Sequence, residues 1–264
     1  MGLQTILGLR RQGFFVPYRY AENVQAPGAY PELEPVFAAA ALPEMLDRIE
    51  EAVAPIAGVD GPPPAPRWGQ SWFPRLDAAA AYAMVLEARP ARIVEVGSGH
   101  STRFLARAAR DLGRPVAITC IDPAPRAALT GLAIDWRREV LGPAHLPLFA
   151  ELDGGDIAFF DSSHLLWPGT DVDLILNRIL PVLRPGVRAH IHDVFLPDPY
   201  PADWAWRGYT EQLGLAGYLT SPGWRVLWAS YYGVTRMAAG ERAAISVLPL
   251  MPGARESSLW IERQ

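Results

Sequence analysis

The chain has 264 residues, of which half are hydrophobic and 20% are charged, and its net charge is −4 at neutral pH. This composition is that of a globular protein and excludes a disordered chain, and the acidic balance argues against nucleic acid or an anionic membrane as a partner. Cys120 is the only cysteine, which excludes an intramolecular disulfide and a cysteine-based metal site, and its apolar surroundings predict a small core residue.

The first part of the chain, residues 1–75, is rich in proline and aromatic residues, and helical spacing of apolar residues predicts one helix there, over 43–56. We expect this part to form a helical and aromatic extension and residues 76–264 to form the main domain, beginning with a helix over 76–88. The N-terminus lacks the pattern of a signal peptide, and no apolar run reaches the 18 residues of a membrane span. The sequence therefore predicts a cytoplasmic protein.

From Arg92 onward, short apolar runs alternate with helical patterns. The runs typical of strands lie at 92–97, 116–122, 156–162 and 187–193, with a weaker one at 138–141 and two later ones at 225–232 and 257–263. The clearest helical patterns lie at 101–113, at 171–186 with Asp171 as N-cap, and near 204–216. Such alternation predicts right-handed crossovers and an α/β fold with a doubly wound parallel sheet.

The segment "VEVGSGHST" (94–102) follows the first of these strands and precedes a helix. In an open parallel sheet, ligands bind beyond the carboxyl ends of the strands, so this segment is a candidate binding loop. Gly97 and Gly99 permit a tight turn and close approach of the backbone to a ligand. Ser101 or Thr102 is expected to cap the helix, whose N-terminal amides attract negative charge.

Two acidic residues select the class of ligand. Glu95 precedes the first glycine and would repel a pyrophosphate, but it suits a ligand that carries an amino group. Thr102 also stands where a dinucleotide fold has its third glycine. Asp122 ends the next strand, where an acid accepts the hydroxyls of a ribose or, alternatively, caps the turn before Pro123. An amine partner and a ribose partner together describe S-adenosylmethionine.

With these residues the chain resembles the class I S-adenosylmethionine-dependent methyltransferases over about residues 70–263. "VEVGSGHST" is similar to their first motif, E/D-x-G-x-G-x-G, with Ser101 in place of the last glycine. "GDIAFFDSSH" and "HIHD" resemble the fourth and fifth strands of a bacterial subgroup related to the macrolide-sugar O-methyltransferases. The resemblance implies a Rossmann-like sheet of seven mostly parallel strands, with 225–232 and 257–263 as the last, partly antiparallel pair.

A second group of polar residues follows the fourth and fifth strands. Asp161 and Asp193 end these strands, which the resemblance makes neighbours ~4.8 Å apart, and His164 and His192 lie close by in sequence. Three interpretations remain open. Asp161 and Asp193 hold a divalent metal such as magnesium or manganese, as the resemblance implies, and His164 removes the acceptor's proton. His192 stands where the resembling enzymes have an acidic residue, and it is a further candidate ligand. Alternatively, His164 or His192 is the base without a metal, or the histidines are structural.

The segment 195–212 is long and aromatic, as lids and binding loops often are. Trp204, Trp206 and Tyr209 would form the wall of an acceptor pocket, with Arg207 or Glu211 as polar anchors; a dimer contact or packing on the sheet is the alternative. "QSWFPRLD" (70–77) could close over the cofactor.

The predicted activity is methyl transfer from S-adenosylmethionine to a small-molecule acceptor, most simply a hydroxyl, by a protein that acts alone or as a homo-oligomer. Two rivals remain at this stage. One is a nicotinamide-dependent oxidoreductase, which Glu95 and Thr102 disfavour, and the other is a non-catalytic methyltransferase-like binding protein. The sequence does not select the acceptor.

Overall fold

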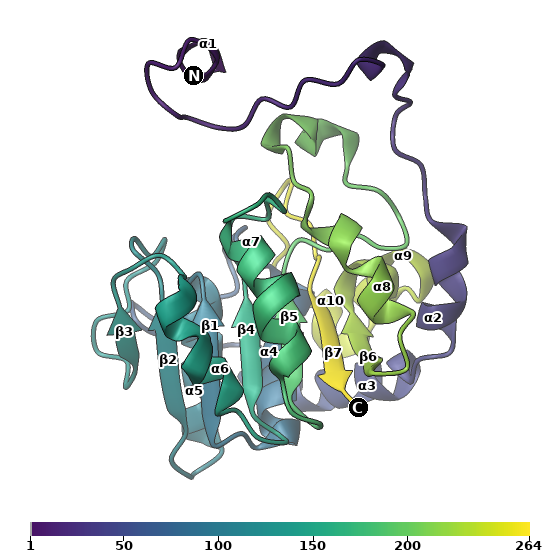
Figure 1. Ribbon diagram of the computed structural model, residues 1–264. Coiled ribbons are helices and arrows are strands. Elements are labelled where there is room, and N and C mark those ends of the chain that lie inside the picture. Colours follow the sequence, from purple (N-terminus) through teal and green to yellow (C-terminus); the bar gives the residue numbers. More distant parts are fainter. Residues whose placement is uncertain (1) are drawn as a thin grey trace.

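The centre of the molecule is a seven-stranded sheet in the order β3-β2-β1-β4-β5-β7-β6 (Figure 1). The structure is a computed structural model and describes residues 2–264. The strands are β1 (Arg92–Val96), β2 (Ala117–Ile121), β3 (Asp135–Arg137), β4 (Ile157–Phe160), β5 (Arg188–Ile191), β6 (Trp224–Ala229) and β7 (Leu259–Arg263). β1 to β5 pair in parallel, whereas β7 pairs antiparallel with both β5 and β6. The prediction of a doubly wound, mostly parallel sheet of seven strands is confirmed.

Helices cover both faces of this sheet. The helices of the described chain are α1 (Gly2–Ile6), which lies in the N-terminal arm, and α2 (Glu34–Ala38), α3 (Leu42–Val53), α4 (Arg75–Ala88), α5 (His100–Asp111), α6 (Leu146–Ala150), α7 (Asp171–Leu174), α8 (Ala216–Leu219), α9 (Ser230–Arg236) and α10 (Ala243–Ser246). α4 packs between α3 and α5, and in Figure 1 it lies behind the sheet while α7 lies in front. Strands with a helix layer on each face must be apolar on both faces, which explains why every residue of β4 is buried.

The composition of α4 explains its central place. Six of its 14 residues are alanine, which favours helix formation and lets α3 and α5 approach closely because the side chains are small. The helix ends at Arg89, a left-handed residue with φ of 50°, just before Pro90. Asp77 is the exception in this apolar stretch: it is fully buried and accepts hydrogen bonds from the backbone amides of Ser257 and Ser258.

The weak strand expected at 138–141 is wrong by three residues, since β3 spans Asp135–Arg137. Trp136 explains the shift, because its indole NH donates to the carbonyl of Asp122 and fixes this part of the chain beside β2. Val140, which the apolar pattern had placed in a strand, is 65% exposed. The strand expected over 225–232 ends at Ala229, after which the chain turns into α9.

Two expected helices are also different in the structure. The helix over 171–186 has Thr170 rather than Asp171 as its N-cap, and it continues after α7 only as a π-helical turn (Ile175–Ile179) and a 3₁₀ turn (Leu180–Val182). Pro181 explains the early end, because proline cannot donate within a helix.

The helix expected near 204–216 is absent from the described chain. The structure has 3₁₀ turns at Ala202–Arg207 and Glu211–Gly214, followed by the short α8. Gly208 breaks the helix with φ of 64°. Gln212 is drawn inward, where its side-chain oxygen accepts from the amide of Phe195. The polar side chains of Glu211 and Gln212 are therefore buried in the structure and do not lie on an exposed helix face.

The N-terminal arm, residues 2–30, runs outside the sheet and its helices (Figure 1). Several of its large apolar side chains are exposed, including Leu3, Leu9 and Phe15. The later part of the predicted extension is different, since α3 packs against α4, α10 and β6; a boundary near residue 75 remains a prediction. Among the described residues, no helix is long and apolar enough to cross a membrane.

Candidate active site

The glycine-rich loop between β1 and α5 requires Gly97. This residue has φ of 77°, and a Cβ atom there would lie 1.7 Å from the carbonyl oxygen of Asp161. The backbone that approaches so closely is therefore the chain's own, at the end of β4. Gly99 is less constrained, because a Cβ there would make only ordinary contacts with the residues after β2.

Glu95 lies under this loop and is fully buried. Its Oε1 accepts from the Ser101 hydroxyl at 2.6 Å, and its Oε2 accepts from the Thr102 hydroxyl at 2.7 Å and from the Cys120 thiol at 3.3 Å. Burial raises the pKa of Glu95 to about 7, although the hydroxyl hydrogen bonds oppose this rise. α5 begins after Gly99, and the Thr102 hydroxyl caps it by accepting from the backbone amide of Gly99 at 2.9 Å. The Ser101 hydroxyl donates to Glu95 instead and makes no capping bond.

Asp122 follows β2 and lies beside the same loop. Its carboxylate accepts from the backbone amide and hydroxyl of Ser98, at 2.6 and 3.1 Å, and from the amide of Ala124 at 2.7 Å. It therefore ties the loop after β2 to the loop after β1. The structure gathers the predicted cofactor-binding residues at this one edge of the sheet: Glu95, Gly97, Gly99, Ser101, Thr102 and Asp122.

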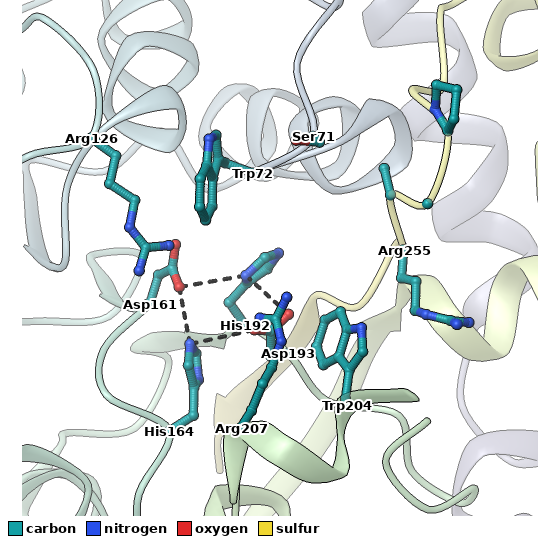
Figure 2. A pocket seen from close by; sticks show the side chains of 13 residues that line it. Ser71, Trp72, Arg126, Asp161, His164, His192, Asp193, Trp204, Arg207 and Arg255 are labelled. Carbon is teal, nitrogen blue, oxygen red and sulfur yellow. Dashed lines mark ion pairs between the residues drawn. The ribbon is translucent and has the colours of Figure 1, made fainter. Parts of the chain in front are cut away.

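Four side chains meet at the ends of β4 and β5, as the strand pairing requires, and we call Asp161, His164, His192 and Asp193 the acid–histidine cluster (Figure 2). Asp161 Oδ1 lies 3.3 Å from His164 Nε2 and 3.5 Å from His192 Nδ1. Asp193 lies 3.5 Å from His164 and 3.6 Å from His192. His164 and Asp193 have positive φ values of 59° and 56°, which are unfavourable for such residues and are found where a site imposes them.

Each histidine of the cluster also forms a hydrogen bond with a further buried carboxylate, through the ring nitrogen that does not face Asp161. His164 Nδ1 forms a hydrogen bond with Glu211 at 2.8 Å, and His192 Nε2 forms one with Asp77 at 3.2 Å. Glu211 was predicted only as an anchor for the acceptor, and Asp77 was not predicted as a site residue. The sequence feature that could have indicated a role for Asp77 is its position as an acidic residue next to the run of alanines in α4.

The charges of the cluster stabilise one another. Burial alone would lower the pKa of His164, but the hydrogen bonds to Asp161 and Glu211 raise it well above its usual value. Burial also opposes the charge on His192, and there Asp161 and Asp193 raise the pKa well above its usual value. For Asp161, burial would raise the pKa, but the two histidines hold it far below its usual range.

His190 does not belong to the cluster, although it shares a strand face with His192. It is fully buried, its ring stacks on Phe159 with 3.7 Å between centroids, and its Nε2 forms a hydrogen bond with the hydroxyl of Ser258. Burial, with a smaller effect of His192, lowers its pKa well below the usual value. His190 is therefore a neutral core residue.

The cluster forms the floor of a cavity of about 230 Å³, between the segment 70–77 and the segment 195–212. Trp72 lies on one side and Trp204 on another, as Figure 2 shows. Tyr209 contacts the ring of His164, with 4.6 Å between centroids. The expectation that Trp206 forms part of the wall is wrong, because this residue is 81% exposed and points away from the cavity lining.

Within residues 2–264, no group of three or more histidine, cysteine, aspartate or glutamate side chains is placed so that it could hold a metal ion. The donor atoms of the cluster are instead paired with one another, at 3.3 to 3.6 Å. Carboxylates and imidazoles are nevertheless the ligand types that divalent ions take in proteins. The carboxylates behind both histidines are also typical of metal ligands.

Comparison with known proteins gives one family and a set of similar folds. Residues 94–194 match a family model described as a methyltransferase domain. No curated protein matches the sequence. Among solved structures, the chain is similar to the SAH-bound methyltransferase PaMTH1 of Podospora anserina, at 17% identity over 96% of this chain and 99% of that chain, with a TM-score of 0.44. It is also similar to an O-methyltransferase from Bacillus cereus in complex with SAH, at 13% identity over 84% and 91%, with a TM-score of 0.45.

A third similar structure is the branched-chain polyamine synthase of Thermus thermophilus, at 14% identity over 90% of this chain and 69% of that chain, with a TM-score of 0.44. At these identities and TM-scores, the solved structures decide nothing about the reaction. The matched segment runs from within β1 to the residue after the cluster, so it contains both the glycine-rich loop and the acid–histidine cluster. The sheet order is Rossmann-like, and the part of the chain that carries both groups of residues is similar to a methyltransferase domain.

Proposed function

We propose that the protein transfers a methyl group to a hydroxyl of a small-molecule acceptor held above the acid–histidine cluster. The observation that carries the proposal is the contact between the two sites: Gly97 of the glycine-rich loop lies against the backbone of Asp161. A cofactor on the loop and an acceptor on the cluster would therefore be neighbours. S-adenosylmethionine supplies an electrophilic methyl group, so the protein has to align the acceptor, exclude water and remove a proton.

For the cofactor, we propose that Gly97 and Gly99 receive its methionine part and that Asp122 accepts the ribose hydroxyls. Glu95 stays the candidate partner for the amino group. Because both of its oxygens already accept from Ser101 and Thr102, it would have to exchange one of these bonds to reach a ligand.

For the proton, we propose His164 as the base. Glu211 holds Nδ1, and Nε2 lies 3.3 Å from Asp161 on the cavity floor, so the proton of the acceptor hydroxyl would pass to Nε2 as the oxygen gains the methyl group. The raised pKa of His164 means that this imidazole keeps its proton to higher pH than an ordinary histidine. Transfer should therefore accelerate as the pH rises, until His164 is neutral.

Metal assistance is part of the proposal, with Asp161, Asp193 and His192 as ligands. Four acidic side chains, Asp161, Asp193, Asp77 and Glu211, surround the two histidines His164 and His192. A divalent cation would offset this excess of acids, with His192 binding it as a neutral imidazole. Such an ion would lower the pKa of an acceptor hydroxyl bound to it.

The test is methyl transfer by the purified protein to a panel of phenols, sugars and amines, followed through the methylated product. We expect methylation of hydroxyl acceptors, loss of turnover in His164→Gln and unchanged binding of S-adenosylhomocysteine by that variant. The exposed Glu44→Gln is the control. Methylation of amines alone, or full turnover in His164→Gln, would overturn the assignment of the acceptor or of the base.

The metal is tested separately by elemental analysis and by chelation followed by addition of magnesium or manganese. Loss and recovery of turnover are expected, and Asp161→Asn and Asp193→Asn should each lose the metal. Full turnover after chelation, with no metal detected, would leave His164 acting without one.

A further inference from the structure

The cavity above the acid–histidine cluster also carries the opposite charge on its walls. Three arginines line it, Arg126, Arg207 and Arg255 (Figure 2). They come from different elements: Arg126 from the loop after β2, Arg207 from the 3₁₀ turn Ala202–Arg207, and Arg255 from the segment before β7. A ligand in this cavity therefore meets acids and histidines on one side and guanidinium groups on the other.

Arg207 is held in place without an acidic partner. Its guanidinium carbon lies 3.9 Å from the ring centroid of Trp204 and 5.4 Å from those of Trp206 and Tyr209. One nitrogen donates to the Tyr209 hydroxyl at 3.1 Å, and Nε is buried with no hydrogen-bond partner within residues 2–264. No carboxylate of the described chain pairs with Arg207, whereas Arg255 pairs with Asp203 at 2.9 Å. The aromatic rings thus fix the guanidinium group of Arg207, and its Nε remains available to donate to a ligand.

The position of Arg207 separates it from the proposed cofactor site. Arg126 follows Asp122 closely, and its backbone amide lies 3.8 Å from where a Cβ of Gly99 would stand. Arg126 therefore belongs to the edge with the glycine-rich loop. Arg207 enters from the segment after β5, where the acceptor is expected.

These observations restrict the acceptor. A guanidinium group pairs best with a planar carboxylate, through two parallel hydrogen bonds, and a neutral acceptor would leave its buried donors unmatched. Two tryptophans in the lining favour an aromatic ring. The volume of about 230 Å³ lies below the ~300–1,000 Å³ of pockets for drug-sized ligands, which favours a single ring.

We propose that the acceptor is a small aromatic acid, whose carboxylate pairs with Arg207 while its hydroxyl faces Asp161 and His164. This inference deepens the proposed function and rests on it for the place of the hydroxyl. The pairing with Arg207 stands on the geometry of the cavity alone.

The experiment compares protocatechuate, a ring with two adjacent hydroxyls and one carboxylate, with its neutral primary amide. Calorimetry of both compounds is done on the protein saturated with S-adenosylhomocysteine. We expect the acid to bind at least about tenfold more tightly than the amide, as charge-assisted pairing implies. Arg207→Gln should remove this preference, and Arg207→Lys, which keeps the charge but loses the planar fork, should retain part of it. The exposed Arg178→Gln is the matched control and should bind like the parent protein.

Equal affinity of the acid and the amide for the parent protein would overturn the proposal. A loss of S-adenosylhomocysteine affinity in Arg207→Gln would also overturn it, because Arg207 would then serve the cofactor. The outcomes also separate the two proposals. Arg207-dependent binding of the acid without methyl transfer to any hydroxyl would refute the proposed function alone. Methylation of protocatechuate at the same rate in the parent protein and in Arg207→Gln would refute the pairing with Arg207 alone.

Discussion

The buried Glu95 should make the stability of the protein fall with pH, and Glu95→Gln should remove that fall. Burial raises the pKa of Glu95 from an ordinary 4.5 to about 7. The unfolded chain therefore releases this proton at lower pH than the folded one, and the free energy of unfolding decreases between about pH 4.5 and 7 and stays lower above. Since one pKa unit corresponds to about 1.4 kcal/mol, ionised Glu95 costs the folded state roughly 3 kcal/mol.

Glutamine keeps the shape of the side chain but cannot ionise. It keeps a carbonyl oxygen for one hydroxyl, and the amide in place of the second oxygen weakens the other hydrogen bond by about 1 kcal/mol. We expect Glu95→Gln to be about as stable as the parent protein at pH 5 and about 2 kcal/mol more stable at pH 8.

Urea unfolding at several pH values measures the difference directly. The control is Glu44→Gln on the exposed face of α3, which should keep the pH dependence of the parent protein. A stability difference between Glu95→Gln and the parent that is the same at pH 5 and pH 8 would refute the reasoning, since Glu95 would then titrate alike in the folded and unfolded chains.

Three further substitutions test other parts of the site and its frame. Gly97→Ala should lower the melting temperature sharply or prevent folding, because its Cβ would overlap the Asp161 carbonyl, and a normal melting curve would contradict the close approach. Asp122→Ala should leave the fold intact and weaken S-adenosylhomocysteine at least about tenfold by calorimetry, by loss of charge-assisted hydrogen bonds; unchanged affinity would mean that the cofactor lies elsewhere. Glu256→Gln should destabilise the protein by about 3 kcal/mol in urea unfolding, because Arg75, bound through two nitrogens at 2.7 and 2.8 Å, would lose its partner. An unchanged urea midpoint would show that this pair contributes nothing.

The parts of the site that could be predicted are those set by local pattern. Apolar runs placed the strands, and the family resemblance, which made the fourth and fifth strands neighbours, brought Asp161 and Asp193 together. The glycines of the loop were recognisable in the same way. Their detailed partners were not, since nothing local shows that the hydroxyls after the loop would turn inward to Glu95.

The parts that could not be predicted depend on contacts between distant segments. Asp77 reaches His192 across 115 positions of sequence, and Glu211 reaches His164 across 47. The pattern near 204–216 was interpreted as a helix, but burial of Glu211 and Gln212 outweighs helix propensity there. The helix prediction failed in this segment because two of its side chains are buried at the site.

The position of β7 has a consequence for how the molecule is assembled. β6 has no other strand as a partner, and β5 has its second partner only in β7, which lies about 70 positions later in the sequence. Until β7 inserts between them, both strands present unpaired backbone edges, and such edges invite association with other chains. Because closing so long a loop is slow compared with local helix formation, completion of the sheet should be a late step in folding. The segment that carries Arg255 reaches the cavity only with that step, so one half of the sheet and one wall of the acceptor site form together.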